Sequence, residues 1–308
     1  MYSLAKLAPL KVMVLFWQQG ALPAVLVFLV AWLPPVALSE INDPVVAALD
    51  KIAESLDARV GFSAYDLETG QRWAYQADQR FPLLSTFKTL ACADLLHRAD
   101  KGELQLSREV FFSSADLVTY SPVTAEFADR QAMTLFELCE ATLTTSDNTA
   151  ANLILQALGG PEAVTRFVKL LGDDTTRLDR WETELNEARP GDVRDTTTPN
   201  AMVSTMQGLL LGNLLSVESK AQLRNWLERN RVADGLFRAA VPKGWVVADR
   251  TGSGEFGSRS ITAIIWPPER QPIVVALYIT ETGSSLSERN QAIADVGAAL
   301  VMAIHQGN

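Results

Sequence analysis

The sequence has 308 residues and a formal net charge of −9 at pH 7, from 36 acidic and 27 basic side chains. An acidic surface repels phosphate groups, so nucleic acids and anionic membranes are disfavoured as partners, and an anionic substrate would need cations gathered at its binding site. Low-complexity segments and internal repeats are absent, and a chain of this length can bury a large core.

The first 39 residues have the composition of a secretory signal peptide. Lys6 and Lys11 precede a long apolar stretch, which ends where the small residues Ala37 and Ser39 have the spacing of a cleavage site. We expect export to the periplasm, with no stable membrane association once residues 1–39 are removed. The remaining 269 residues lack the two lysines and carry a net charge of −11. An uncleaved membrane anchor is the alternative, because the apolar stretch is longer than a usual signal core.

The rest of the chain contains elements of both kinds. Apolar spacing after a proline predicts a helix over residues 44–57, and two extended runs predict a hairpin over 59–76. The middle of the chain has helical patterns, which cover residues 85–100, 134–145, 148–160, 161–172, 200–212 and 216–230. Three runs rich in β-branched and aromatic residues predict strands, and a last helix follows them: 244–252, 258–268, 272–280 and about 285–305.

Two strands before the helical block and three after it predict an α/β protein of the α+β type. We expect one five-stranded antiparallel sheet flanked by N- and C-terminal helices, with an all-helical subdomain inserted between its strands. The catalytic domain would cover residues 40–308, with a sheet subdomain at about 40–80 plus 231–308 and a helical subdomain at about 81–230. Pockets favour such junctions, so a cleft is expected where the two parts meet.

Ser85 and Lys88 are three residues apart at the start of a predicted helix. A serine hydroxyl needs a base to take its proton, and the usual base is histidine. His97 would lie about 18 Å along the helix axis, out of reach, and His305 is almost at the chain end. Lys88 would share a helix face with Ser85 and could act as a base if burial lowered its pKa. The alternative is a helix-capping serine followed by a solvent-facing lysine.

Three further stretches contain polar residues suited to catalysis. The stretch TTSDNTA contains Ser146 and Asn148, and a polar segment without clear periodicity contains Glu182 and Asn186 in an apparent Ω-loop. The stretch DRTGSGEFGSR contains Arg250 where a strand ends. Considered one at a time, each stretch has a simpler structural interpretation. The first would be a loop with a helix cap, the second a charged surface connection, and the third a glycine-rich hairpin with a basic residue.

In this order and spacing, the set resembles the class A serine β-lactamases, whose motifs are S-x-x-K, S-D-N and K-T-G. The resemblance covers essentially all of the mature chain. Here R-T-G replaces K-T-G, which is similar to the carbenicillin-hydrolysing branch of the class. It implies a β-lactamase/transpeptidase-like fold, a monomer without metal or other cofactor, and a small-molecule β-lactam as the only partner. The implied activity is hydrolysis of penicillins, carbenicillin included, which would confer resistance.

The resemblance also implies roles for individual residues. Ser85 would be acylated, Ser146 would relay a proton to the leaving nitrogen, and Glu182 with Asn186 would activate the water that releases the acyl group. Whether Lys88 or Glu182 is the base for acylation stays open. The backbone N–H groups of Ser85 and Ser253 would form the oxyanion hole. The implied substrate-binding residues are Tyr120, Asn148, Arg250, Thr251, Gly252, Ser253 and Arg259, with the two arginines flanking the substrate carboxylate.

Two structural pairs are also expected. Cys92 and Cys139 are the only cysteines, and in an exported chain an even pair predicts a disulfide, although two buried thiols are the alternative. With only two histidines beside them, a zinc site is not expected. The resemblance implies that Arg180 and Asp195 close the neck of the Ω-loop.

Two other functions remain open on the sequence alone. A penicillin-binding transpeptidase or carboxypeptidase shares the serine and lysine but lacks a deacylating glutamate, so Glu182 argues against it. A non-catalytic β-lactam sensor would keep the acyl group as a signal. Only a β-lactamase would show many rapid turnovers for each serine.

Overall fold

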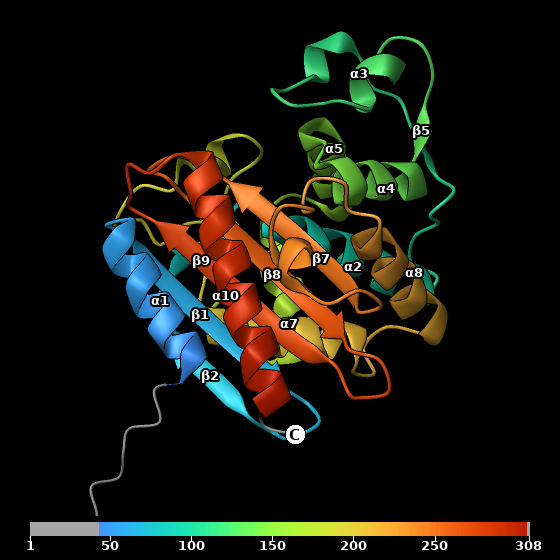
Figure 1. Ribbon diagram of the computed structural model, residues 1–308. Coiled ribbons are helices and arrows are strands. Elements are labelled where there is room, and N and C mark those ends of the chain that lie inside the picture. Colours follow the sequence, from blue (N-terminus) through green and yellow to red (C-terminus); the bar gives the residue numbers. More distant parts are fainter. Residues whose placement is uncertain (1–42, 307–308) are drawn as a thin grey trace, which may run out of the picture. The chain divides into compact units, whose positions relative to one another are not determined.

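The computed structural model describes residues 43–306, so the predicted signal peptide, residues 1–39, lies outside the described residues. The centre of the fold is a five-stranded antiparallel sheet in the order β2-β1-β9-β8-β7 (Figure 1). Its strands are β1 (Arg59–Asp66), β2 (Arg72–Tyr75), β7 (Val246–Ser253), β8 (Arg259–Trp266) and β9 (Ile273–Thr280). The predicted α+β fold is therefore confirmed.

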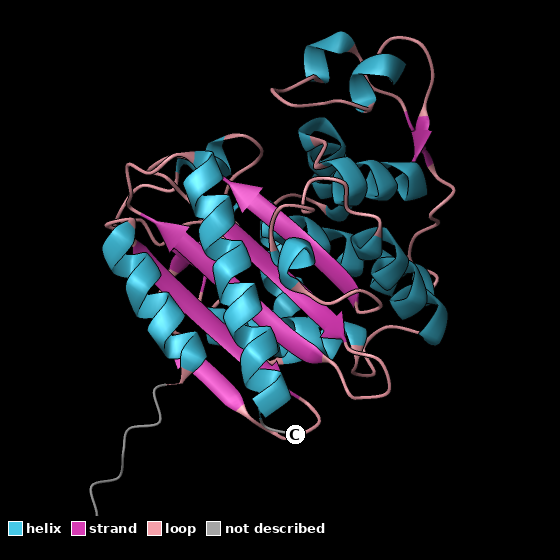
Figure 2. Ribbon diagram, in the orientation of Figure 1, coloured by secondary structure: helices cyan, strands magenta, loops and turns pink. Residues whose placement is uncertain are grey.

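Helices cover both faces of this sheet (Figure 2). The first and last helices lie side by side on one face, and the central helices lie on the other. The α-helices are α1 (Pro44–Ser55), α2 (Phe87–Asp100), α3 (Thr124–Phe127), α4 (Leu135–Thr145), α5 (Asn148–Leu158), α6 (Glu162–Val168), α7 (Pro199–Leu210), α8 (Val217–Glu228), α9 (Phe237–Ala240) and α10 (Leu286–Gln306).

Short elements connect these helices. Two small ladders pair β3 with β6 and β4 with β5. Their bounds are β3 (Phe81–Pro82), β4 (Glu109–Val110), β5 (Met133–Thr134) and β6 (Thr196–Thr197). Short 3₁₀ turns occur at Leu84–Thr86, Ser114–Asp116, Lys169–Leu171 and Glu184–Glu187.

Strand β9 shows why the sheet sequences are continuously apolar. Its odd positions, from Ile273 to Ile279, pack in a core with α1 and α10, whereas its even positions, from Val274 to Tyr278, pack in a larger core with the central helices. Successive side chains of a strand point to opposite faces, so a strand covered on both sides has no polar face. The sheet is thus the shared wall between two cores.

Local signals set the helix starts. α4 begins at the capping box that the sequence contains, where Thr134 Oγ1 accepts a hydrogen bond from Glu137 N and Glu137 Oε2 accepts one from Thr134 N. α2 begins at Phe87, two residues later than predicted, because the 3₁₀ turn comes first. Ser85 therefore lies in a tight turn and not in the α-helix itself.

The predicted disulfide between Cys92 and Cys139 is not formed in this structure, and that prediction was wrong. Both residues are free thiols, fully buried where α2 packs against α4. Burial, with a smaller contribution from a hydrogen bond to Cys92, raises the pKa of the Cys139 thiol well above its usual value. The compartment predicted a bridge, whereas this structure has two buried thiols in contact with each other.

The packing of β1 against β3 leads to the first prediction. A Cβ on Gly61 would lie 2.2 Å from Phe81 Cε2, so Gly61→Ala forces a fully buried ring to move. Overpacking of this kind costs about 1–3 kcal/mol, and we expect the free energy of unfolding in urea to fall by that amount.

Gly235→Ala is the matched control, because a Cβ there meets no atom within 4 Å and the backbone conformation suits alanine. It should leave the urea midpoint nearly unchanged. Equal effects of the two substitutions would show that contact with Phe81 is not the cause.

Candidate active site

Ser85 lies where the sheet meets the helices, in the turn between β3 and α2. The residue before it, Leu84, has a φ of 50°, in the left-handed region that is unfavourable for a branched side chain. Strand β7 passes so close that a Cβ on Gly252 would lie 2.7 Å from the backbone nitrogen of Ser85. Packing from both sides therefore holds the serine in one position.

Ser253 brings a second backbone group towards the same place. β7 is an edge strand, and across its hairpin the N–H of Gly254 donates to the carbonyl of Ser258. Alternate residues of an antiparallel strand direct their N–H groups to opposite sides. The N–H of Ser253 therefore points away from β8, across the open edge of the sheet.

Lys88 is fully buried in the first turn of α2 and does not face solvent. Its Nζ donates to the carbonyl of Ser146 at 3.0 Å and to Asn148 Oδ1 at 2.5 Å, and it lies 3.0 Å from Glu182 Oε1. Burial lowers the pKa of Lys88 to about 8, against the opposing effect of the Glu182 carboxylate. A lysine with this pKa can exchange a proton near neutral pH.

Glu182 lies between the serine and the lysine. Its Oε1 accepts a hydrogen bond from Ser85 Oγ at 3.4 Å, and its Oε2 accepts one from Asn186 Nδ2 at 2.5 Å. The side chain is buried in the wall of the site, although its segment is a surface loop. The sequence placed Glu182 and Asn186 in one loop, and the structure brings both into one network with Ser85 and Lys88.

Asn152 is a positioning residue that sequence reasoning missed. Its Nδ2 donates to the carbonyl of Glu182 at 2.8 Å, and its Oδ1 accepts from the N–H of Glu182 at 2.9 Å. One side chain on α5 thus satisfies both backbone groups of the glutamate. An asparagine four positions after Asn148, on the same face of a largely apolar helix, was the signal that could have identified it.

The neck of the Ω-loop is closed by the Arg180–Asp195 ion pair that the family resemblance implied, through one contact between the side chains and not the bidentate pair expected. Arg180 Nε lies 2.6 Å from Asp195 Oδ2. The second oxygen of Asp195 accepts hydrogen bonds from the N–H groups of Asp179 and Arg180. The buried Asp195 carboxylate therefore ties the two ends of the loop together through side chain and backbone.

Ser146 occupies the sharp junction between α4 and α5, with a φ of 68°. Its Oγ accepts hydrogen bonds from Arg250 Nη2 and, at 3.3 Å, from Lys88 Nζ, and lies 3.5 Å from Ser85 Oγ. Asp147 caps α5 through Ala150 N and also accepts from Thr124 Oγ1. The junction is thus fixed by a buried carboxylate, and two cations direct the Ser146 hydroxyl towards Ser85.

Arg250 requires a correction to the expected set of substrate-binding residues. The sequence grouped Arg250 with Thr251 as substrate contacts, but the guanidinium is fully buried and does not line the cavity. Successive residues of β7 point to opposite faces of the sheet. The Arg250 side chain therefore lies inside the protein, where it donates to Ser146 Oγ, whereas Thr251 lines the cavity. Burial lowers the pKa of Arg250 to about 10, and it stays charged at neutral pH.

A cavity of about 410 Å³ opens above these residues. Arg259 supplies its guanidinium, held by Asn290 Oδ1 at 2.8 Å and by the carbonyl of Gly252 at 2.9 Å. Burial, and then the neighbouring Arg250, lower the pKa of Arg259 to about 10. Tyr120 is about half exposed. The lining residues are Ser85, Tyr120, Ser146, Asn148, Asn186, Val232, Thr251, Gly252, Ser253, Arg259, Leu286 and Asn290.

Residues 43–306 contain neither a metal-binding cluster nor a helix able to span a membrane. Within this range, no three His, Cys, Asp or Glu side chains are grouped so that they could hold a metal ion. None of the helices described there is both long and apolar enough to span a membrane.

Known proteins are similar to this chain in sequence and in architecture. The pattern of the "Beta-lactamase enzyme family" matches residues 44–304. The chain is 51% identical over 249 residues to Beta-lactamase CARB-4 of Pseudomonas aeruginosa, covering 81% of this chain and 86% of CARB-4. It is 48% identical over 255 residues to Beta-lactamase AER-1 of Aeromonas hydrophila, covering 83% and 84%.

Solved structures are similar as well. An ancestral class A β-lactamase (GNCA) has a TM-score of 0.82 and 49% identity, covering 84% of this chain and 99% of that chain. The chromosome-encoded β-lactamase of Vibrio parahaemolyticus has a TM-score of 0.82 and 45% identity, covering 86% and 100%.

The contact between Lys88 and Glu182 leads to the second prediction. We expect an NMR titration of the lysine side chains to find one ammonium group with a pKa of about 8. Because the carboxylate of Glu182 raises this pKa, Glu182→Gln should lower it further. Glu184→Gln removes the charge of an exposed carboxylate two residues away and should leave the pKa of Lys88 unchanged. A pKa that stays constant or rises in Glu182→Gln would contradict the pairing.

Proposed function

The chain belongs to the β-lactamase enzyme family, among its class A members, and we propose that it hydrolyses penicillins, carbenicillin included, through an acyl-enzyme on Ser85. The observation that carries the proposal is the position of Glu182, whose one carboxylate contacts both Ser85 Oγ and Lys88 Nζ. A base beside the acylated serine suits release of the acyl group to water, which separates a hydrolase from a transpeptidase or a sensor.

Acylation begins with attack of Ser85 Oγ on the strained lactam carbonyl. The serine proton passes to Glu182, which accepts a hydrogen bond from Ser85 Oγ, or to Lys88, which contacts the serine through Glu182 Oε1 and Ser146 Oγ. The oxygen that gains negative charge would accept from the N–H groups of Ser85 and Ser253. The C–N bond of the ring then breaks.

The departing ring nitrogen needs a proton, and Ser146 is placed to give it. Its hydroxyl oxygen accepts from Lys88 and Arg250, so its own hydrogen is free to point towards Ser85 and the substrate. Lys88 Nζ, also bonded to the Ser146 carbonyl, can restore that proton. Arg250 therefore acts through Ser146, as a buried positive charge that keeps the hydroxyl oriented.

Deacylation reverses the direction of proton flow. A water between Glu182 and the ester would lose a proton to the carboxylate as its oxygen attacks the acyl carbon. Asn186 donates to Glu182 Oε2, and Oε1, which faces Ser85, would act as the base. The ester C–O bond breaks, Ser85 Oγ recovers a proton, and the penicilloic acid leaves.

Substrate would be held by groups that line the cavity. Arg259 presents a planar guanidinium that can bind the substrate carboxylate through two hydrogen bonds, with Thr251 and Ser253 beside it. Asn148 would bond the acylamide group, and Tyr120 would cover the mouth of the cavity. The cations of the site overcome the repulsion that an acidic protein exerts on an anionic substrate.

The proposed setting is the periplasm of the producing cell. Residues 1–39 would act as the signal peptide, and the mature chain would work as a monomer without metal or other cofactor. The composition of that segment supports export, and hydrolysis there would confer β-lactam resistance by destroying the drug before it reaches its target.

The proposed base leads to the third prediction. Glu182→Ala should leave acylation by benzylpenicillin measurable while deacylation slows by orders of magnitude, because water loses its base but Ser85 keeps its surroundings. Mass spectrometry after brief exposure should find the acyl adduct. Glu184→Ala, in the same loop but exposed, is the control and should turn over normally. Turnover of benzylpenicillin at the wild-type rate by Glu182→Ala would show that Glu182 is not the base for deacylation.

The carboxylate-binding group leads to the fourth prediction. Losing a charge-assisted contact costs about 1.5–3 kcal/mol, so Arg259→Ala should lower kcat/KM for benzylpenicillin and carbenicillin about tenfold to a hundredfold. Arg259→Lys keeps the charge but not the planar guanidinium, and its kcat/KM should lie between those of the wild type and Arg259→Ala. A stable Arg259→Ala enzyme with normal kcat/KM would exclude carboxylate binding by this residue.

A further inference from the structure

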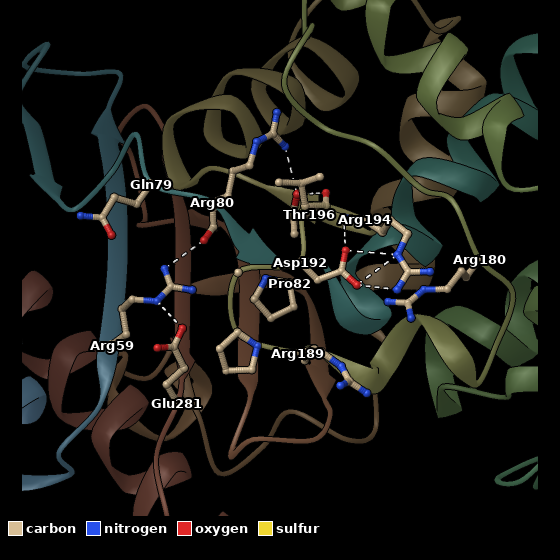
Figure 3. A pocket seen from close by; sticks show the side chains of 14 residues that line it. Arg59, Gln79, Arg80, Pro82, Arg180, Arg189, Asp192, Arg194, Thr196 and Glu281 are labelled. Atoms are coloured by element: carbon tan, nitrogen blue, oxygen red, sulfur yellow. Dashed lines mark hydrogen bonds and ion pairs between the residues drawn. The ribbon is translucent and has the colours of Figure 1, made fainter.

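A second cavity, of about 400 Å³, lies between the late part of the Ω-loop and the ends of the sheet strands (Figure 3). Arg59 at the start of β1 and Glu281 after β9 lie on one side, and Arg194, Asp192 and Arg180 lie on the other. Arg80 and Arg189 complete a set of five lining arginines. No residue of this cavity belongs to the lining of the active-site cavity.

The hydrogen bonds of these arginines leave part of each guanidinium unused. Arg59 donates through Nε and Nη1, and Arg180 also through Nε and Nη1. Arg189 and Arg194 donate through Nε and Nη2, and Arg80 only through Nη1. At least one terminal nitrogen of every arginine therefore has no protein partner among residues 43–306.

The charges around the cavity leave a positive surplus. Two carboxylates line it, Asp192 and Glu281, and two more pair with lining arginines from outside, Glu187 and Asp195. Four carboxylates face five guanidinium groups, and Arg80 is the one without a carboxylate partner, since it donates to Thr175 O and Thr196 Oγ1. A local surplus of cations in a chain of net charge −9 attracts anions to this place.

We infer that this cavity binds a small free oxyanion with two or more negative charges, of the phosphate or polycarboxylate class. Unused guanidinium nitrogens are the donors that match such oxygens, and one anion can accept from several arginines at once. The volume suits a small molecule and not a polypeptide.

The bound anion would connect two parts of the protein. Arg59 belongs to the sheet, whereas Arg189 and Arg194 belong to the loop that also contains Glu182. An anion shared between them would hold residues 188–196 against the sheet and stabilise the folded chain by mass action. Any effect on turnover rests on the proposed function, but binding and stabilisation do not.

The experiment compares thermal unfolding in 20 mM inorganic phosphate and in chloride at the same pH and ionic strength. We expect phosphate to raise Tm by about 3 °C, the shift that corresponds to a ligand at roughly ten times its dissociation constant. Hydrogen exchange of the backbone at residues 188–196 should be slower in phosphate than in chloride. Citrate, tested in the same way, shows whether carboxylates bind more tightly than phosphate.

Variants locate the site. Arg189→Gln/Arg194→Gln removes two exposed cations and should raise the dissociation constant at least tenfold, whereas Arg189→Lys/Arg194→Lys should stay within about threefold of the wild type. Arg229→Gln is the matched control, a similarly exposed arginine paired with one carboxylate far from the cavity, and should keep the full response. Arg259→Ala should also keep it, because that cation belongs to the active site.

Three results would overturn the proposal. The first is equal Tm in phosphate and chloride, which shows that ionic strength is the only effect. The second is a full response in Arg189→Gln/Arg194→Gln together with loss in Arg259→Ala, which assigns the anion to the active site. The third is co-sedimentation with phosphatidylglycerol vesicles without a response to free phosphate, which assigns the arginines to a membrane headgroup. Failure of Glu182→Ala to accumulate acyl adduct would affect the proposed hydrolysis and leave these outcomes intact.

Discussion

The buried ammonium group of Lys88 is the feature on which the rest of the site depends. A charge removed from water is tolerated only when nearby groups compensate it, and here the compensating oxygens come from two separate segments. Ser146 and Asn148 come from the junction of α4 and α5, and Glu182 comes from the Ω-loop. If either segment moves away, part of the buried charge loses its compensation, so both segments are held against α2.

The same requirement explains how a long loop can place a catalytic group accurately. Glu182 is fixed at its backbone by Asn152, at its carboxylate by Lys88 and Asn186, and at the neck of its loop by Asp195. Loops are usually the mobile part of a fold, and function placed on them depends on anchors of this kind. The exposed Arg189 and Arg194, in the later part of the loop, form ion pairs with little burial, which are worth much less.

The sequence predicted the sheet, the helical insertion and most of the site because those inferences use local patterns and fixed motif spacing. It could not place Arg250, because a motif does not show which face of the strand a side chain takes. Asn152 was missed for a similar reason, since its partner is the backbone of a residue 30 positions away. The cysteine pair was judged by compartment, whereas the structure contains two buried free thiols. The second cavity draws on residues from 59 to 281, so no single stretch contains its signal.

Strand β7 has no strand partner on its outer side, and unpaired edges invite pairing with other chains, but most of β7 is buried, with α8 and the turn at residues 84–86 packed against it. Here the hairpin end of that edge opens into the active-site cavity, where Tyr120 and Asn186 line the space beside it. An amide group lying along Ser253 would occupy the place of a sixth strand, but a space of about 410 Å³ has room for only a short piece of one. The protein can thus keep an unpaired edge for recognition while resisting the edge-to-edge association that leads to aggregation.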